Sequence, residues 1–243
     1  MLEGAEGMTP QDLKIPVVKI VQGTSKMDDS DAHLGHWYNS ITGEFKAGLE
    51  VVILSSKHTR ALFRRMDEAD ADKPECLSRD CITGTVHGAC NRCEFNAQIH
   101  PDLWQKDLGT GQAPKRCNLG YALMLLLVED GLPGIFTAQK SNVNPIKIVN
   151  TILVGRKSPL FGATFLFTTV RKIEGQRKWY ELSAKVARWH TPEEIAQYRT
   201  LSQSLKTASF EVIDEETTEP VPPPADDEPP APPLDSYEGG APF

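Results

Sequence analysis

The sequence predicts a mainly β protein: a five-stranded barrel with a Cys-rich insertion, a central helix and a C-terminal helix, followed by a disordered tail. Three observations lead to this prediction. Apolar segments of strand length are separated by turn residues. All five cysteines lie in one aperiodic stretch, and the chain ends in acidic, proline-rich sequence. The 243 residues suit one large domain, 1–210, with an insertion at 67–118 and a tail at 211–243.

The chain before the insertion reads as a series of extended segments. Residues 13–22 are apolar, and Pro16 disfavours a helix there. Residues 36–45 have the pattern of a hairpin, and residues 49–54 and 59–66 predict two further strands. We therefore expect paired strands on the N-terminal side of the insertion.

Regular patterning resumes after the insertion. Asp130–Gly131 marks a turn between two strands, and Thr191, Pro192 and Glu194 form the start of a capped helix. The expected elements are strands at 119–129 and 134–139, a helix at 141–155, a hairpin of 164–173 with 178–189, and a helix at 191–208. Five main strands with one helix between the third and the fourth match the order of an OB-fold barrel.

The insertion carries the thiols of a predicted metal site. About fifty aperiodic residues are improbable in a compact domain unless something else orders them. Cys90 and Cys93 form a C-x2-C turn that can place two thiolates on one ion, and Cys117 is a natural third ligand. A tetrahedral structural Zn²⁺ would supply the missing order. Its fourth ligand is Cys76 or Cys81, with His87 and His100 as alternatives.

Charge is distributed unevenly along the chain. All 26 Lys and Arg residues precede Glu211, whereas ten of the 33 Asp and Glu residues lie from Glu211 onward. Residues 131–210 hold twelve basic and four acidic side chains, which is typical of a phosphate-binding face. The acidic tail has too few apolar residues to offset its ordering entropy, so we expect it to be disordered and to compete for a basic groove.

Aromatic and basic side chains are interleaved in the last predicted hairpin. Single-stranded nucleic acid is held by cations that neutralise phosphates and by rings that stack on bases. Alternation along residues 178–189 places Trp179, Lys185 and Trp189 on a face toward solvent or ligand, opposite a more apolar face; the alternative is that Trp179 and Trp189 pack under the terminal helix. The candidate DNA-binding residues are Lys57, Arg60, Arg64, Lys140, Arg156, Lys157, Arg171, Lys172, Arg177, Lys178, Trp179, Lys185 and Arg188, with Trp37 and Tyr38 as rings that pave a groove or cover a barrel end.

The tail resembles that of the single-stranded-DNA-binding proteins of bacteria and their phages. In bacterial and T7-like phage proteins, an OB-fold precedes a disordered acidic tail that ends in Phe, often after Pro. Asp226–Glu228 and Ala241–Phe243 match that plan, although Gly239 and Gly240 stand where the bacterial tip has a dense Asp run. The resemblance implies that the tail recruits polymerase, helicase-primase or nuclease partners through Asp235, Glu238, Pro242 and Phe243.

The cysteine segment is similar to a family of phage-encoded proteins that carry C-x-S-x-D, C-x2-C and a later Cys before an apolar strand. The matching segments are Glu75–Asp80, Gly88–Cys93 and Lys115–Cys117, and the likeness covers roughly residues 50–175. It implies Cys76 rather than Cys81 as the fourth ligand, giving the set Cys76, Cys90, Cys93 and Cys117. T4-type helix-destabilising proteins also combine an OB-fold with zinc.

These features predict a phage-type protein that coats single-stranded DNA, with little sequence specificity, in replication, recombination or repair. Homo-oligomers are compatible with this prediction. The alternatives are a zinc-containing recombination or transcription accessory factor, a zinc-dependent nuclease and a structural virion component. The sequence has no H-E-x-x-H, P-loop or G-x-S-x-G motif, so we expect no enzyme. No apolar run approaches the ~20 residues of a membrane helix, and the acidic N-terminus is unlike a signal peptide, so we expect the host cytoplasm.

Overall fold

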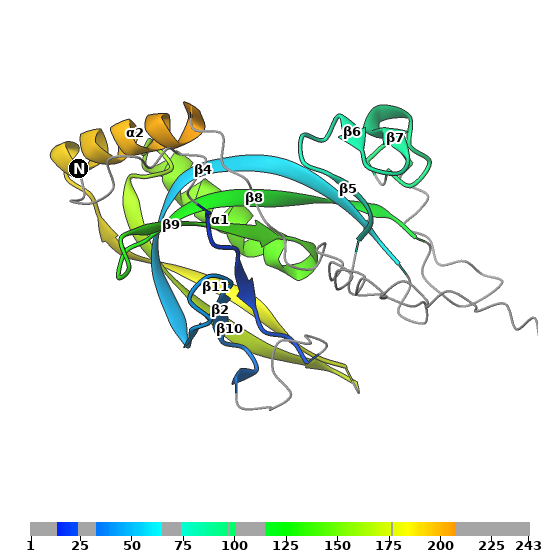
Figure 1. Ribbon diagram of the computed structural model, residues 1–243, viewed down its shortest axis with the longest axis horizontal. Helices are drawn as coiled ribbons and strands as arrows, with labels where there is room; N and C mark the ends of the chain where they lie inside the picture. Colours follow the sequence, from blue (N-terminus) through cyan, green and yellow to red (C-terminus); the bar gives the residue numbers. More distant parts are fainter. Residues whose placement is uncertain are drawn as a thin grey trace, which may run out of the picture. The chain divides into compact units, whose positions relative to one another are not determined.

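The computed structural model of the protein describes residues 14–23, 33–64, 74–96, 98–100, 115–175 and 177–207. The predicted tail, with Asp235, Glu238, Pro242 and Phe243, lies outside these residues. The described chain is mainly β, as the sequence predicts, with two α-helices (Figure 1). No helix in the described ranges is long and apolar enough to cross a membrane.

A six-stranded antiparallel sheet dominates the structure. Its order is β11-β10-β4-β8-β9, and β5 pairs with the last part of β4. The sequence predicted an OB-fold-like five-stranded barrel. The two outer strands, β11 and β9, are not paired with each other, so within the described chain the sheet is open and does not close into a barrel (Figure 1). The strands are β4 (Gly48–Phe63), β5 (Pro74–Ser78), β8 (Cys117–Leu127), β9 (Leu132–Ala138), β10 (Ala163–Glu174) and β11 (Arg177–Trp189).

The sequence predicted two strands, at 49–54 and 59–66, where the structure has the single 16-residue strand β4. Residues 55–58, between the two predicted strands, are polar, but they contain no Gly or Pro that would end a strand. The register against β8 shifts between Ile53 and Ser55, which marks a bulge at Leu54. A bulge bends its strand, so the first part of β4 pairs with β10 and the last part with β5.

The Cys-rich insertion is less aperiodic than predicted. Its first strand, β5, belongs to the large sheet. Its described part also contains β6 (Thr83–Gly84), β7 (Gly88–Ala89) and the 3-10 turn η3 (Cys90–Arg92). Elements of two to five residues are too short to show a periodic pattern, so the sequence could not reveal them.

The N-terminal segment forms a three-stranded sheet of β1 (Val18–Ile20), β2 (Trp37–Asn39) and β3 (Phe45–Lys46). It contacts both outer strands of the large sheet. The Ile135 amide of β9 donates to the Pro16 carbonyl at 2.8 Å. The Gln22 side chain makes two hydrogen bonds, of 2.8 and 2.9 Å, with the main chain of Tyr180 on β11. Isolated hydrogen bonds, instead of a continuous ladder, therefore link this segment to the open edges.

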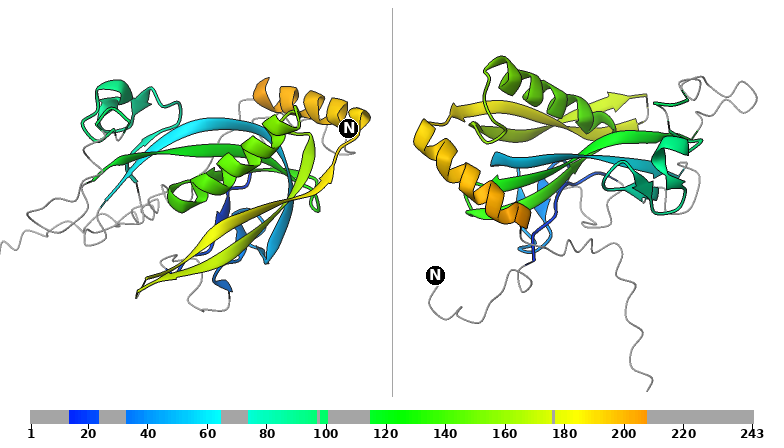
Figure 2. Two further views of the ribbon diagram at one scale, coloured as in Figure 1. Left: turned by 180° about the vertical axis from the view of Figure 1, so that it is seen from behind. Right: turned by 90° about the horizontal axis from the view of Figure 1, so that it is seen from above.

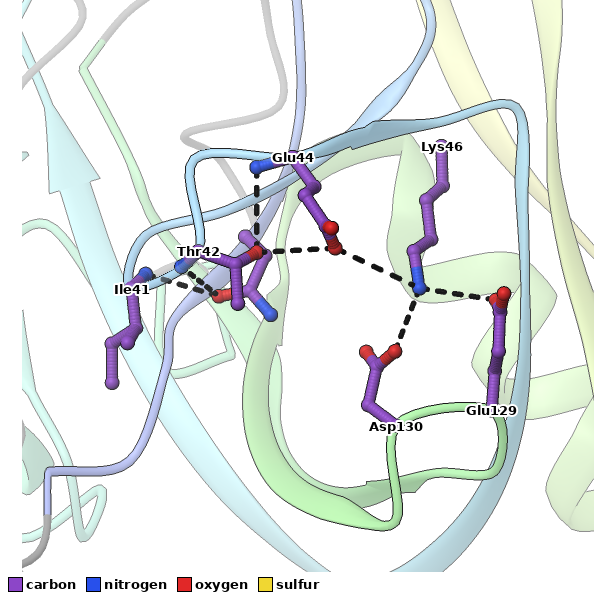
Figure 3. A network of polar contacts seen from close by, with 7 residues as sticks. Ile41, Thr42, Glu44, Lys46, Glu129 and Asp130 are labelled. Carbon is purple, nitrogen blue, oxygen red and sulfur yellow. Dashed lines mark hydrogen bonds and ion pairs between the residues drawn. The ribbon is translucent and has the colours of Figure 1, made fainter.

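A polar network fixes the three-stranded sheet to the turn between β8 and β9 (Figure 3). Lys46 of β3 donates to Asp130 at 2.8 Å and to Glu129 at 3.0 Å, and Glu44 lies 3.9 Å from the same ammonium. The hydrogen bond to Asp130 is the largest cause that raises the pKa of Lys46. The network therefore stabilises the charged form of Lys46 at this junction.

Two helices pack on the large sheet (Figure 2). Helix α2 (Pro192–Thr207) begins with the predicted capping box, in which the Glu194 amide donates to Thr191 Oγ1 and the Thr191 amide donates to Glu194 Oε2. Ser202 of α2 donates to the Leu54 carbonyl at the bulge, where neither β10 nor β5 pairs with β4. Helix α1 (Val143–Gly155) follows the 3-10 turn η5 (Lys140–Asn142) and buries Val143, Ile146, Val149 and Leu153.

Candidate metal centre and nucleic-acid interface

Four of the five cysteines line one small cavity near the last residues of β4. They are the four ligands expected from the sequence, and Cys81 does not line the cavity. The cavity has a volume of about 10 Å³, close to the smallest space that holds a water molecule. The lining thiols come from β5 (Cys76), from the start of η3 (Cys90), from the residue that follows η3 (Cys93) and from the start of β8 (Cys117).

Strand register brings two of these thiols to one place. Leu62 of β4 pairs with Cys76 of β5 on one side and with Cys117 of β8 on the other. Residues that are directly opposite in neighbouring strands share a face of the sheet. Gly84 of β6 approaches the Cys76 sulfur so closely that a Cβ at this position would lie 2.6 Å from it. The close approach therefore requires glycine at position 84.

Asn96 holds the C-x2-C turn in place. Its side chain donates to the Cys90 carbonyl at 2.7 Å, and its amide donates to the Cys93 carbonyl at 3.0 Å. Asn96 also forms an isolated parallel bridge with Cys117, so it connects three of the four cysteine positions. Sequence reasoning missed this residue because an asparagine shortly after a C-x2-C turn has no distinctive pattern.

Arg60 lies at this cavity and not on a DNA-binding groove wall, which corrects the sequence-based expectation. It is only 6% exposed, and its guanidinium donates to Asn96 Oδ1 at 2.8 Å and to Gln98 Oε1. Arg60 shares strand parity with Leu62, which is fully buried. Residues of the insertion, Asn96 and Gln98, contact the guanidinium, so a side chain that looked like an exposed cation is enclosed.

The donor chemistry of the cavity fits a soft cation. Four sulfur donors form a ligand set of structural zinc. Burial raises the pKa of Cys117 to about 11, while the charge of Arg60 acts in the opposite direction. Within the described ranges, no three Cys, His, Asp or Glu side chains stand in an arrangement that could hold a metal ion. Metal binding would therefore have to draw the thiols inward as they lose their protons.

A charged cluster at the rim of the cavity connects the two ends of the insertion. Glu75 of β5 accepts a hydrogen bond from Lys115 at 2.9 Å and lies 3.4 Å from His87 Nε2. The hydrogen bond from Lys115 is the largest cause that lowers the pKa of Glu75. The cluster ties β5 to the chain just before β8 and to the β6–β7 turn.

The hairpin of β10 and β11 carries the largest group of predicted DNA-binding residues. In its register, Lys172 lies opposite Trp179, and Leu166 lies opposite Lys185. Lys172, Trp179 and Lys185 therefore share one face. The Trp179 indole donates to Glu181 at 2.8 Å, and its ring is partly exposed. The exposed cations of the hairpin are Arg171, Lys172, Lys178, Lys185 and Arg188, and the side chain of Arg177 lies outside the described part.

Of the two alternatives for Trp189, the structure favours packing: its ring is partly buried against the core and does not share the face of Trp179. The register of β10 against β11 shifts between Thr164 and Phe165, so Ala187 is an extra residue and the alternation changes. Arg156 stacks over the Trp189 ring at 4.8 Å. Arg156, one of the predicted DNA-binding cations, is therefore held against Trp189 at the base of the hairpin.

The other predicted residues lie apart from this hairpin. Trp37 is 1% exposed and packs edge-on against Phe136, so its ring belongs to the core and cannot stack on a base; the expectation for Trp37 is corrected. Tyr38 is half-buried beside Phe45. Four further cations are exposed: Lys57 on β4, Arg64 just after β4, Lys140 over the Phe63 ring, and Lys157 just after α1.

Comparison of the chain with protein-family models, with curated proteins and with solved structures finds no match in any of the three. The function therefore has to be argued from the chain's own residues.

Proposed function

We propose that the protein binds single-stranded DNA with little sequence specificity, in replication, recombination or repair. The observation that carries this proposal is the β10–β11 hairpin, on which exposed cations surround a partly exposed indole. Cations there would neutralise phosphates, and the Trp179 ring would stack on a base whatever its identity. The proposal needs neither the closed barrel nor base-specific hydrogen bonds.

One face of the hairpin suits this role better than the other. Lys172 lies directly opposite Trp179, and Lys185 lies on the same face six residues further along β11, so a DNA strand that runs along this face with one base stacked on the ring could bring phosphates to both ammonium groups. Glu181 accepts the indole hydrogen bond and lies 3.9 Å from Lys172. This carboxylate would orient the ring while leaving most of the cationic charge available.

The proposal includes two further parts. A structural Zn²⁺ would be held by Cys76, Cys90, Cys93 and Cys117, where it would order the insertion and supply no catalytic step. The acidic tail would recruit replication or recombination proteins through Asp235, Glu238, Pro242 and Phe243. The tail would also compete with DNA for the cationic hairpin, because the tail and DNA are both anionic.

The decisive experiment is a tryptophan-fluorescence titration of the full-length protein with oligothymidylate, single-stranded and double-stranded, at two salt concentrations. We expect quenching by the single strand, weaker binding of the duplex and an affinity that falls with salt. A protein lacking residues 211–243 should bind more tightly. No binding at low salt, with or without the tail, would refute the proposed function.

A second candidate function is a recombination or transcription accessory factor that grips another protein. Two large apolar side chains on the hairpin favour it, since Val170 is 45% and Ile173 60% exposed. In that case removal of the tail should abolish function while DNA affinity stays unchanged or falls. A zinc-dependent nuclease would instead degrade single-stranded DNA and lose that activity when Cys90 is changed to Ser.

A further inference from the structure

Arg60 is a buried permanent charge whose hydrogen-bond partners are neutral. Its guanidinium donates to the amide oxygens of Asn96 and Gln98. Among the residues that the structure describes, no Asp or Glu forms an ion pair with it. Burying a charge without an opposite charge is costly. A source of negative charge is therefore expected within reach of this side chain.

The thiols of the cavity are that source. Arg60 lines the cavity together with all four predicted ligands, and its charge acts on Cys117 at the cavity and on the nearby Cys81. A divalent cation bound by four thiolates carries a formal charge of −2, so a guanidinium beside it offsets half of that charge. With neutral thiols, the guanidinium has no such partner.

We propose that Arg60 is the buried counter-charge of an anionic metal centre formed by Cys76, Cys90, Cys93 and Cys117. This inference rests on the structural zinc of the proposed function, and it defines the chemical class of that metal site. The site takes a soft divalent cation on four thiolates, and His87, although it lines the cavity, is not a ligand. Arg60 is a positioning residue: it acts through the charge of the centre and through Asn96, which also holds the C-x2-C turn.

The test measures zinc affinity of the full-length protein by competition with a chromophoric chelator. Arg60→Met removes the charge and keeps an apolar stem, and we expect zinc binding about tenfold weaker or worse, as for loss of one partner of a buried charge pair. Arg92→Met is the matched control, because Arg92 is an exposed arginine inside the same C-x2-C turn. It should stay within about twofold of the natural protein.

A charge-compensation cycle separates this role from simple packing. Cys93→His replaces the less buried thiolate of the C-x2-C turn with a neutral donor, which lowers the negative charge of the centre by one. The Arg60→Met/Cys93→His double variant should therefore bind zinc about tenfold more tightly than the product of the two single losses predicts. Multiplicative losses, or equal effects of Arg60→Met and Arg92→Met, would overturn the proposal. If Arg60→Met does not fold, Arg60→Gln replaces it, since Gln keeps an N–H donor for Asn96.

Failure of this inference and failure of the proposed function can be told apart, because the chelator assay contains no DNA. A natural protein that binds no zinc refutes both the structural zinc and the role of Arg60. Zinc binding with multiplicative losses refutes only the role of Arg60. If the natural protein does not bind oligothymidylate but the charge-compensation cycle gives the expected zinc affinities, only the role of the hairpin is refuted.

Discussion

The proposed DNA interface can be tested by comparing the two faces of one hairpin. The double variant Lys172→Ala/Lys185→Ala removes two cations from the face of Trp179, whereas Arg171→Ala/Lys178→Ala removes two cations from the opposite face. Both variants change the net charge equally. Each phosphate contact contributes about 0.7 to the slope of log affinity against log salt for single strands. Loss of two contacts should therefore reduce the slope by about 1.4 in the first variant only.

The assay is the oligothymidylate titration, repeated over a series of salt concentrations. Circular dichroism and thermal unfolding of both variants serve as controls for folding. Equal reductions in the two variants would show that the hairpin attracts DNA by charge alone, without the oriented contact that we propose. An unchanged slope in both would exclude the hairpin as the interface. Arg188→Ala should have a smaller effect than either lysine, since Arg188 already pairs with Glu194 at 2.7 Å.

Three further outcomes follow from single side chains. Trp179→Ala should remove most of the fluorescence quenching and weaken oligothymidylate binding by about 1–3 kcal/mol, measured by competition with a labelled strand. Lys46→Met should lower the free energy of unfolding by about 1 kcal/mol in urea titrations at neutral pH. The pKa of Lys46 is raised in the folded protein, chiefly by Asp130, so its contribution is complete below pH 10.5 and is lost above it; Lys46→Met should therefore flatten the alkaline loss of stability. Gly84→Ala should weaken zinc binding in the chelator assay more than Gly155→Ala, because a Cβ at position 84 meets the Cys76 sulfur whereas one at position 155 meets nothing.

Much of the fold could be predicted where an element is long and its pattern regular. The β10–β11 hairpin, the two helices and the capping box at Thr191 all follow from local signals that the structure confirms. The closure of the sheet could not be predicted in the same way. It depends on how β4 bends at Leu54 and on which strands flank its two ends, and a bulge at the end of an apolar run leaves no mark in the sequence.

The candidate sites show the same division. Cysteine spacing indicated Cys90, Cys93 and Cys117 among the thiols that line the cavity, because thiol ligands are rare and their spacing is constrained, whereas Cys76 was implied only by the resemblance to phage-encoded proteins. Basic residues are common, so the sequence could not separate Arg60, buried at the cavity, from exposed cations such as Lys172. Trp37 was ambiguous for a related reason, since a core ring and a stacking ring have the same pattern in a short strand.

The strands of the two proposed sites pair with different parts of β4, and this limits how the sites can influence each other. Strand β4 pairs with β10 up to Val52 and with β5 from Arg60 onward, a separation of at most about 26 Å along the strand. No residue of the thiol cavity belongs to β10 or β11. Loss of metal should therefore disorder the insertion first and leave the hairpin's salt slope nearly unchanged. If metal removal does lower DNA affinity, the insertion itself must contact the DNA strand.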